Sequence, residues 1–136
     1  MSKIMTKTRF RNIFLALLLL GTTACSEPFL YFSGGRLGGE EAALVELPSS
    51  SGVLQIETLP SAPYSVNIGF VLLDGKLYID PALDRQWYQN TLVDPAVRVR
   101  FGGSDLVHPM MTVREEDPEV IAQFDPTRIV LRLEPR

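Results

Sequence analysis

The segment Gly75 to Gly103, GKLYIDPALDRQWYQNTLVDPAVRVRFGG, carries the strongest structural signals of this chain. Its first residue forms the pair Asp74-Gly75, which stands between two apolar runs and is the strongest short signal for a β-hairpin. The stretch DRQWYQNTLVD from Asp84 predicts a short helix. Pro95 predicts the end of that helix, because proline disfavours helical geometry at the residue before it.

The run that follows, Ala96–Phe101, alternates apolar residues with arginines. Strict alternation predicts a half-buried strand in which Arg98 and Arg100 lie on the same side. These arginines form a solvated face unless a ligand or the acidic residues of the chain cover them.

Most of the remaining chain also consists of short apolar or alternating runs bounded by turn residues. The other strands that we expect are Ala43–Leu47, Val53–Leu59, Val66–Leu73, Lys76–Ile79, Leu106–Val113 and Arg128–Leu133. A second short helix is expected from Glu116, with Asp117 as N-cap and Pro118 at the first helical position. Seven short strands in one domain predict a mainly β (α+β) fold, either a sandwich or an antiparallel barrel.

The helix and strand of the opening segment resemble the split β-barrel superfamily, which includes flavin reductases and pyridoxamine-phosphate oxidases. The likeness is greatest to its deazaflavin-dependent nitroreductase branch. The residues that match are Trp87, Tyr88, Asn90, Leu92, Asp94, Pro95, Val97, Val99, Gly102 and Gly103, with Thr91 inserted between the Asn and the Leu. The resemblance implies a small six- to seven-stranded antiparallel split β-barrel over residues 42–136. It also implies a monomer more than a homodimer, because deazaflavin members can bind their cofactor within one chain.

The same resemblance implies a planar cofactor, FMN or a deazaflavin, and a nitroreductase-like oxidoreductase activity. The residues expected at this cofactor are Arg85, Trp87, Tyr88, Asn90 and Arg98. Trp87 and Tyr88 then line a flat heteroaromatic ring, and an arginine contacts its polar edge. In the alternative, Trp87 packs the helix onto the barrel and Asn90 hydrogen-bonds the loop. No residue is identified as catalytic.

The segment after the Ser51-Gly52 turn, VLQIETLP, departs from the branch, which usually places Lys and Arg there to meet a cofactor phosphate. It has no basic residue and contains Glu57 instead. Because phosphate binding relies on charge-assisted hydrogen bonds, this departure leaves two further hypotheses open. The protein is a cofactor-free envelope lipoprotein that acts as an interaction or structural module, or it is an unrelated small β-barrel.

The N-terminus has the layout of an export signal, which we assign to residues 1–24. A basic region precedes the apolar run Ile13–Leu20 and a short stretch of small residues. A helix from Ile13 to Ala24 would rise only about 18 Å, whereas the hydrocarbon core of a membrane is roughly 30 Å thick. A cleaved signal peptide is therefore favoured over a membrane span.

Cys25, the single cysteine, directly follows the small residues Thr23 and Ala24 and resembles the lipidated cysteine of bacterial lipoproteins. Lipidation would anchor the chain to a membrane through a tether and incoming loop, residues 25–41. Ser26 resembles the residue that sorts lipoproteins to the outer membrane, so we expect the protein on its periplasmic face. The alternative is an ordinary secretory cleavage that leaves a soluble protein.

The charge of the mature chain argues against several classes of partner. Removal of residues 1–24 takes away four of 13 basic residues and none of 16 acidic ones, which leaves a net charge of about −7. A nucleic-acid partner is disfavoured, since it would require a basic surface. A metal site is not expected either, because His108 is the only histidine and Cys25 is taken up by the anchor.

Overall fold

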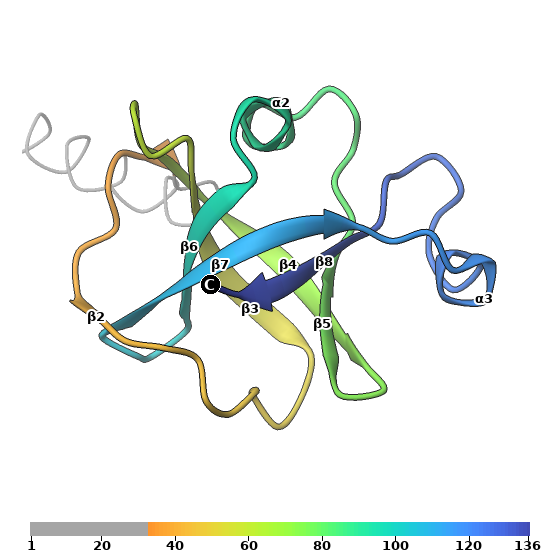
Figure 1. Ribbon diagram of the computed structural model, residues 1–136, viewed down its shortest axis with the longest axis horizontal. Helices are drawn as coiled ribbons and strands as arrows, with labels where there is room; N and C mark the ends of the chain where they lie inside the picture. The colour runs from red at the N-terminus through yellow and green to blue at the C-terminus, as the bar shows by residue number, and fades with distance from the viewer. Residues whose placement is uncertain (1–32) are drawn as a thin grey trace, which may run out of the picture. The chain divides into compact units, whose positions relative to one another are not determined.

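Six strands close into an antiparallel barrel in the computed structural model, which describes residues 33–136 (Figure 1). The predicted signal peptide and Cys25 lie outside the described residues. The six strands are β3 (Gly52–Thr58), β4 (Tyr64–Leu73), β5 (Lys76–Ile79), β6 (Ala96–Phe101), β7 (Leu106–Arg114) and β8 (Leu131–Pro135). Their order around the ring is β4-β3-β6-β7-β8-β5, and β5 pairs back onto β4. This confirms the expected mainly β fold with an antiparallel barrel.

Two very short strands add to the ring within residues 33–41. β1 (Ser33–Gly34) pairs antiparallel with β4, and β2 (Glu40–Glu41) pairs parallel with β7. One edge of the ten-residue strand β4 is therefore paired with β1 in its first half and with β5 at its end. Its other edge is paired with β3. Part of the segment that we expected to be an incoming loop is thus joined to the sheet.

The hairpin between β4 and β5 forms where the Asp74-Gly75 pair predicted it. Both residues have positive φ, 50° for Asp74 and 72° for Gly75, as a two-residue turn of the I′ type requires. The turn sets the register in which Leu73 faces Lys76. The expected strands at β5 and β6 have the predicted bounds, and those at β3, β4 and β7 differ by two residues or fewer.

The expected strand Ala43–Leu47 is wrong. The backbone leaves β7 after the amide of Ala42 donates to Val107 O at 3.0 Å, and residues 42–47 then continue without strand structure. Leu44 and Leu47 are half-buried and pack against the core, whereas Val45 is 94% exposed. The apolar content of this segment therefore covers the barrel by side-chain packing and not by strand pairing.

The last strand begins three residues later than expected, at Leu131 instead of Arg128. Arg128 belongs to a turn, in which its amide donates to Asp125 O at 3.0 Å. The side chain of Asp125 also accepts from the amide and the hydroxyl of Thr127. These local bonds hold residues 125–128 as a turn and delay the start of β8.

Both expected helices are present, as α2 (Gln86–Val93) and α3 (Pro118–Ile121). Asp117 is the N-cap of α3, where its side chain accepts from the amide of Glu119, and this confirms the prediction made from Asp117-Pro118. Figure 1 shows α2 over one end of the barrel and α3 projecting at the side. Neither helix, within residues 33–136, has the length and apolar character needed to cross a membrane.

The core fills the inside of the ring and continues under α2. Its members are Leu54, Ile56, Phe70, Leu77, Ile79, Trp87, Tyr88, Val97, Val99, Met110, Leu131 and Leu133. The alternation predicted for β6 is confirmed, since Val97 and Val99 are fully buried while Arg98 and Arg100 lie on the other side of the strand. The barrel is therefore held mainly by apolar side chains contributed by every strand of the ring.

Among Gly35, Gly38 and Gly39, Gly39 has the least space for a side chain. Its φ is 134°, and a Cβ at this position would lie 2.2 Å from the backbone oxygen of Asp105. We expect Gly39→Ala to lower the free energy of unfolding by about 2–4 kcal/mol, through backbone strain and steric overlap. The matched control is Gly38→Ala, where a Cβ meets nothing within 4 Å and the expected change is within about 0.5 kcal/mol. Urea unfolding of the two variants measures the difference, and equal midpoints would contradict the prediction.

Candidate functional site

Arg98, one of the residues expected at a cofactor, forms a buried ion pair with Glu57. The two residues face each other in the register of β6 against β3. Nη1 of Arg98 lies 3.1 Å from Oε2 and 3.3 Å from Oε1 of Glu57. The side chains are 11% and 4% exposed. The arginine charge is therefore matched inside the protein by an acidic residue of the neighbouring strand.

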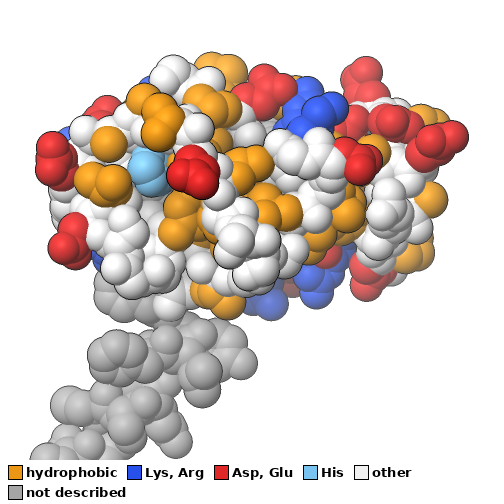
Figure 2. All heavy atoms as spheres, turned by 90° about the horizontal axis from the view of Figure 1, so that it is seen from below, with side chains coloured by type: hydrophobic (Ala, Val, Ile, Leu, Met, Phe, Trp, Pro, Cys, Tyr) orange, Lys and Arg blue, Asp and Glu red, His pale blue; other side chains and the backbone are white. Residues whose placement is uncertain are grey.

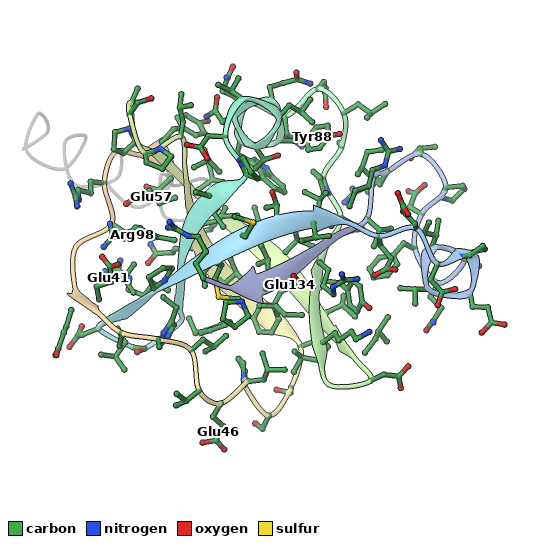
Figure 3. All side chains as sticks on the ribbon, viewed as in Figure 1. Glu41, Glu46, Glu57, Tyr88, Arg98 and Glu134 are labelled. Atoms are coloured by element: carbon green, nitrogen blue, oxygen red, sulfur yellow. The ribbon has the colours of Figure 1, made fainter. Side chains whose placement is uncertain are left out.

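The ion pair also holds residues 36–39, which we call the strap. The amide of Leu37 donates to Oε2 of Glu57 at 2.6 Å, and its carbonyl accepts from Nη1 of Arg98 at 3.4 Å. Arg100 holds the next residue, because its Nη1 donates to the carbonyl of Gly38 at 2.6 Å. Figure 3 shows Glu57, Arg98 and Glu41 gathered beside this part of the chain.

The Nε groups of the two arginines differ in their surroundings. Nε of Arg100 donates to Oε1 of Gln55 at 2.7 Å, again across the β3–β6 register. Nε of Arg98 is buried without a hydrogen-bond partner among the described residues, and Oε2 of Glu41 lies 3.8 Å away. The face formed by these arginines is thus covered by the strap and by polar residues of β3.

The helix α2 presents its aromatic residues to the core. Trp87 and Tyr88 are 7% and 5% exposed and belong to the same apolar cluster as the barrel strands. In Figure 3 Tyr88 lies beside α2, away from Glu57 and Arg98. The ring faces of both residues are therefore occupied by protein contacts.

Asn90 joins α2 to the end of β3. Its Nδ2 donates to Oγ1 of Thr58 at 3.0 Å, and its Oδ1 accepts from Nε2 of Gln86 at 2.8 Å. The hydroxyl of Thr58 in turn donates to the carbonyl of Tyr64 at 3.1 Å. Both side-chain groups of Asn90 are thus used within the protein, in a buried network that positions the helix.

Arg85 occupies the N-cap position of α2 and is exposed. Its side chain makes no ion pair within residues 33–136. The five residues expected at a cofactor therefore lie in different surroundings, namely the core, the α2–β3 network, the ion pair under the strap and the surface. Their role in cofactor binding stays a prediction.

A separate pocket of about 260 Å³ opens at the end of the barrel opposite α2, under residues 42–47. Its lining consists of Leu44, Val45, Glu46, Leu47, Gly75, Lys76, Leu77, Met110, Arg132, Leu133, Glu134 and Pro135. Figure 2, which views the molecule from this side, shows apolar side chains gathered on the face. None of the five residues expected at a cofactor lines this pocket.

Sequence reasoning missed the pocket because it assigned residues 43–47 to a strand. One signal pointed the other way. Leu44 and Leu47 are three residues apart, a spacing that places them on opposite faces of a strand. Both are instead half-buried against the barrel.

A cluster of charged residues borders the pocket at β8. Nη1 of Arg132 donates to Oε2 of Glu115 at 2.6 Å, and its Nε donates to Oε1 of Glu134 at 2.8 Å. Glu115 also accepts from the amide of Asp117 at 3.1 Å, and this bond, together with Arg132, holds the pKa of Glu115 below its ordinary value. Burial raises the pKa of Tyr78, and the nearby charge of Glu115 raises it further.

The lowered pKa of Glu115 predicts a loss of stability in acid. Its contribution is present above the unfolded-state pKa, about 4.5, and is lost as the pH falls through the lower folded-state value. As the pH decreases below about 4.5, we expect the free energy of unfolding to decrease less steeply in Glu115→Gln than in the unaltered protein. Urea unfolding at several pH values between 2.5 and 7 measures the slopes. The control is the same substitution at the exposed neighbouring residue, Glu116→Gln, which is expected to leave the slope unchanged. A slope that is also unchanged in Glu115→Gln would contradict the prediction.

Comparison with known proteins places the fold but not the activity. No protein-family model matches the chain, and no curated protein matches its sequence. A solved protein of unknown function from Agrobacterium tumefaciens strain C58 is 19% identical with a TM-score of 0.51, and the match covers 69% of this chain and 57% of that one. An FAD-binding protein from Mesorhizobium loti is 14% identical with a TM-score of 0.45, covering 62% of this chain and 78% of that one. The first likeness shows a shared fold alone, and the second is too distant to support an argument.

Proposed function

We propose that this protein is an exported, lipid-anchored split β-barrel that binds a ligand or partner in the bacterial cell envelope without a redox cofactor. The observation that carries the proposal is the ion pair between Arg98 and Glu57, 3.1 Å apart. A flavin phosphate requires charge-assisted donors, and the charge of Arg98 is already matched by a buried carboxylate. An anionic ligand at Arg98 would have to displace both Glu57 and the strap.

The aromatic residues of α2 support the same proposal. A planar cofactor needs an accessible ring face or edge to stack against, and Trp87 and Tyr88 are more than nine-tenths buried. Moving either ring out of the core would remove packing worth about 3–5 kcal/mol. A binding protein that uses another surface leaves the core intact.

In this proposal Cys25 carries the lipid anchor and Ser26 directs the protein to the periplasmic face of the outer membrane. The supporting observation is the basic and apolar sequence of residues 1–24 that precedes the cysteine. Cys25→Ser is expected to move the protein from the membrane fraction to the soluble envelope fraction. Labelling with a radioactive fatty acid tests the anchor directly: label is expected on the unaltered protein and not on Cys25→Ser, and an unaltered protein without label would contradict the anchor.

The second candidate is a flavin- or deazaflavin-dependent, nitroreductase-like oxidoreductase. The observation that favours it is the sequence motif Trp87, Tyr88 and Asn90 on a helix that leads directly into β6. This arrangement is the part of the split-barrel pattern that the chain retains most fully.

One experiment separates the two candidates. The chain without residues 1–24 is purified, its absorbance is recorded between 300 and 500 nm, and co-purifying small molecules are identified by mass spectrometry. FMN is then titrated and its fluorescence is followed. The proposal expects a colourless protein and no saturable change in FMN fluorescence. A yellow protein with flavin or deazaflavin near one equivalent would overturn it in favour of the oxidoreductase.

A further inference from the structure

The pocket under residues 42–47 reaches the core of the barrel. Three side chains that line it, Leu77, Met110 and Leu133, are core residues with exposed fractions of 1%, 0% and 4%. The pocket is therefore the open mouth of the barrel, a place where small-molecule sites commonly form. Its floor is built from three different strands, β5, β7 and β8, which fix the floor's shape.

The segment above the floor supplies an apolar wall. Leu44 and Leu47 line the pocket and pack against the core cluster. The segment is held at its start, where the amide of Ala42 bonds Val107 O and the carbonyl of Ala42 lies 2.8 Å from Nδ1 of His108. Leucine side chains thus bound the cavity from above as well as from below.

The polar groups at the pocket already have partners or lie at the exposed rim. Arg132 is bonded to Glu115 and Glu134, so its charge is compensated. The buried side-chain atoms without hydrogen bonds among residues 33–136 are Oδ1 of Asn67 and Nε of Arg98, and neither residue lines the pocket. Lys76 and Glu46, both exposed, supply one charge of each sign at the rim. The interior therefore offers apolar burial and no buried group that needs a ligand partner.

The volume limits the size of the occupant. An apolar protein cavity of about 150 Å³ holds one benzene molecule, and pockets for drug-sized ligands begin near about 300 Å³. At about 260 Å³ the mouth of this barrel suits a single ring with a short alkyl chain. It is too small to take an extended peptide.

We infer that the mouth of the barrel is a binding site for a small uncharged apolar molecule, such as a single alkylated ring. This inference rests on the proposed binding function and gives that function a site and a ligand class. The driving force is the removal of apolar surface from water. A carboxylate of the same size would lose its hydration on entering this apolar cavity, and the arginine that borders the pocket, Arg132, is already paired.

The test is a titration with propylbenzene, followed by the amide NMR signals of the chain without residues 1–24. We expect saturable shifts at Leu44, Leu77 and Leu133. The matched probe 3-phenylpropanoate has the same ring and chain length but a carboxylate, and we expect it to bind at least tenfold more weakly. Equal or tighter binding of the carboxylate would overturn the ligand class. Absence of saturable shifts with propylbenzene, or saturable shifts only elsewhere, would overturn the site.

Two variants locate the binding. Leu44→Glu places a carboxylate on the apolar wall and is expected to weaken propylbenzene binding at least tenfold. Val53→Glu makes the same chemical change on β3, outside the pocket and 61% exposed, and is expected to leave binding unchanged. Leu47→Glu serves if Leu44→Glu does not fold, because Leu47 also lines the pocket, is half-buried and packs against the core. Equal effects of the pocket and control variants would contradict the inference.

The propylbenzene titration tests the site at the barrel mouth, and the absorbance experiment tests the proposed function, so either claim can be overturned without the other. A bound flavin would overturn the proposed function whatever propylbenzene does. A colourless protein that binds neither probe would leave the proposed function standing and overturn only the site at the barrel mouth.

Discussion

Replacing Glu57 by alanine is expected to lower the free energy of unfolding by about 3–5 kcal/mol, because it leaves the buried charge of Arg98 without its partner. The same substitution removes the acceptor for the amide of Leu37, so the strap loses a hydrogen bond of 2.6 Å as well. Urea unfolding, with the midpoint and slope both recorded, measures the loss. A matched control exists on the same arginine. Glu41 is 58% exposed and lies 3.8 Å from Nε of Arg98, so Glu41→Ala is expected to change stability by less than about 1 kcal/mol.

A double substitution separates the charge from the packing. Replacing Glu57 by leucine and Arg98 by methionine removes both charges while keeping side chains of similar length. Most of the stability lost in Glu57→Ala should return in this variant, since buried ion pairs exchanged for apolar residues are often neutral or stabilising. If Glu57→Ala and Glu41→Ala have equally small effects, the pair does not hold the strap as described.

Truncation of Trp87 is the second substitution with a large expected effect. Trp87→Ala removes a ring that is 7% exposed and packed in the main core cluster, and the expected loss is about 3–5 kcal/mol in the free energy of unfolding. Arg85→Ala, two residues earlier and exposed, is the control and should change stability by less than about 0.5 kcal/mol. Thermal and urea unfolding measure both variants. A stable Trp87→Ala protein that has lost flavin binding would instead support the cofactor role of this residue.

The parts of the fold that the sequence predicted well depend on neighbours in the chain. The positive φ angles at Asp74-Gly75 and the cap at Asp117 each follow from residues within a few positions. The alternation in β6 also follows locally, because side chains point to opposite faces of any strand. Contacts with distant segments of the chain leave these local structures unchanged.

The parts that it predicted poorly depend on distant segments. Residues 43–47 are as apolar as a strand, but their place over the barrel mouth is set by the packing of Leu44 and Leu47 against the core. Likewise, Glu57 drew notice in the sequence only because it lies in a segment where the nitroreductase branch usually has basic residues. Its role as the partner of Arg98, 41 positions away, depends on the register of β3 against β6, which no local pattern specifies.

Trp87 shows a different kind of limit. A tryptophan beside a tyrosine suits a core and a stacked ligand equally well, because both offer apolar area with a polar edge. The choice depends on which face of α2 the barrel covers, and the hydrogen bond of Asn90 to Thr58 fixes that face. The helix could be predicted from the sequence, whereas its orientation could not.

The pairing of β5 with β8 has a consequence for how the protein is made. Leu77 faces Leu133 across this pair, so the ring cannot close until the whole chain through β8 is available for folding. Until then the free edges of β5 and β7 expose unpaired backbone groups, which invite association between nascent chains. Folding therefore passes through a stage in which the hairpin of β4 and β5 can form but the barrel cannot, and the open strand edges of that stage are where aggregation would begin.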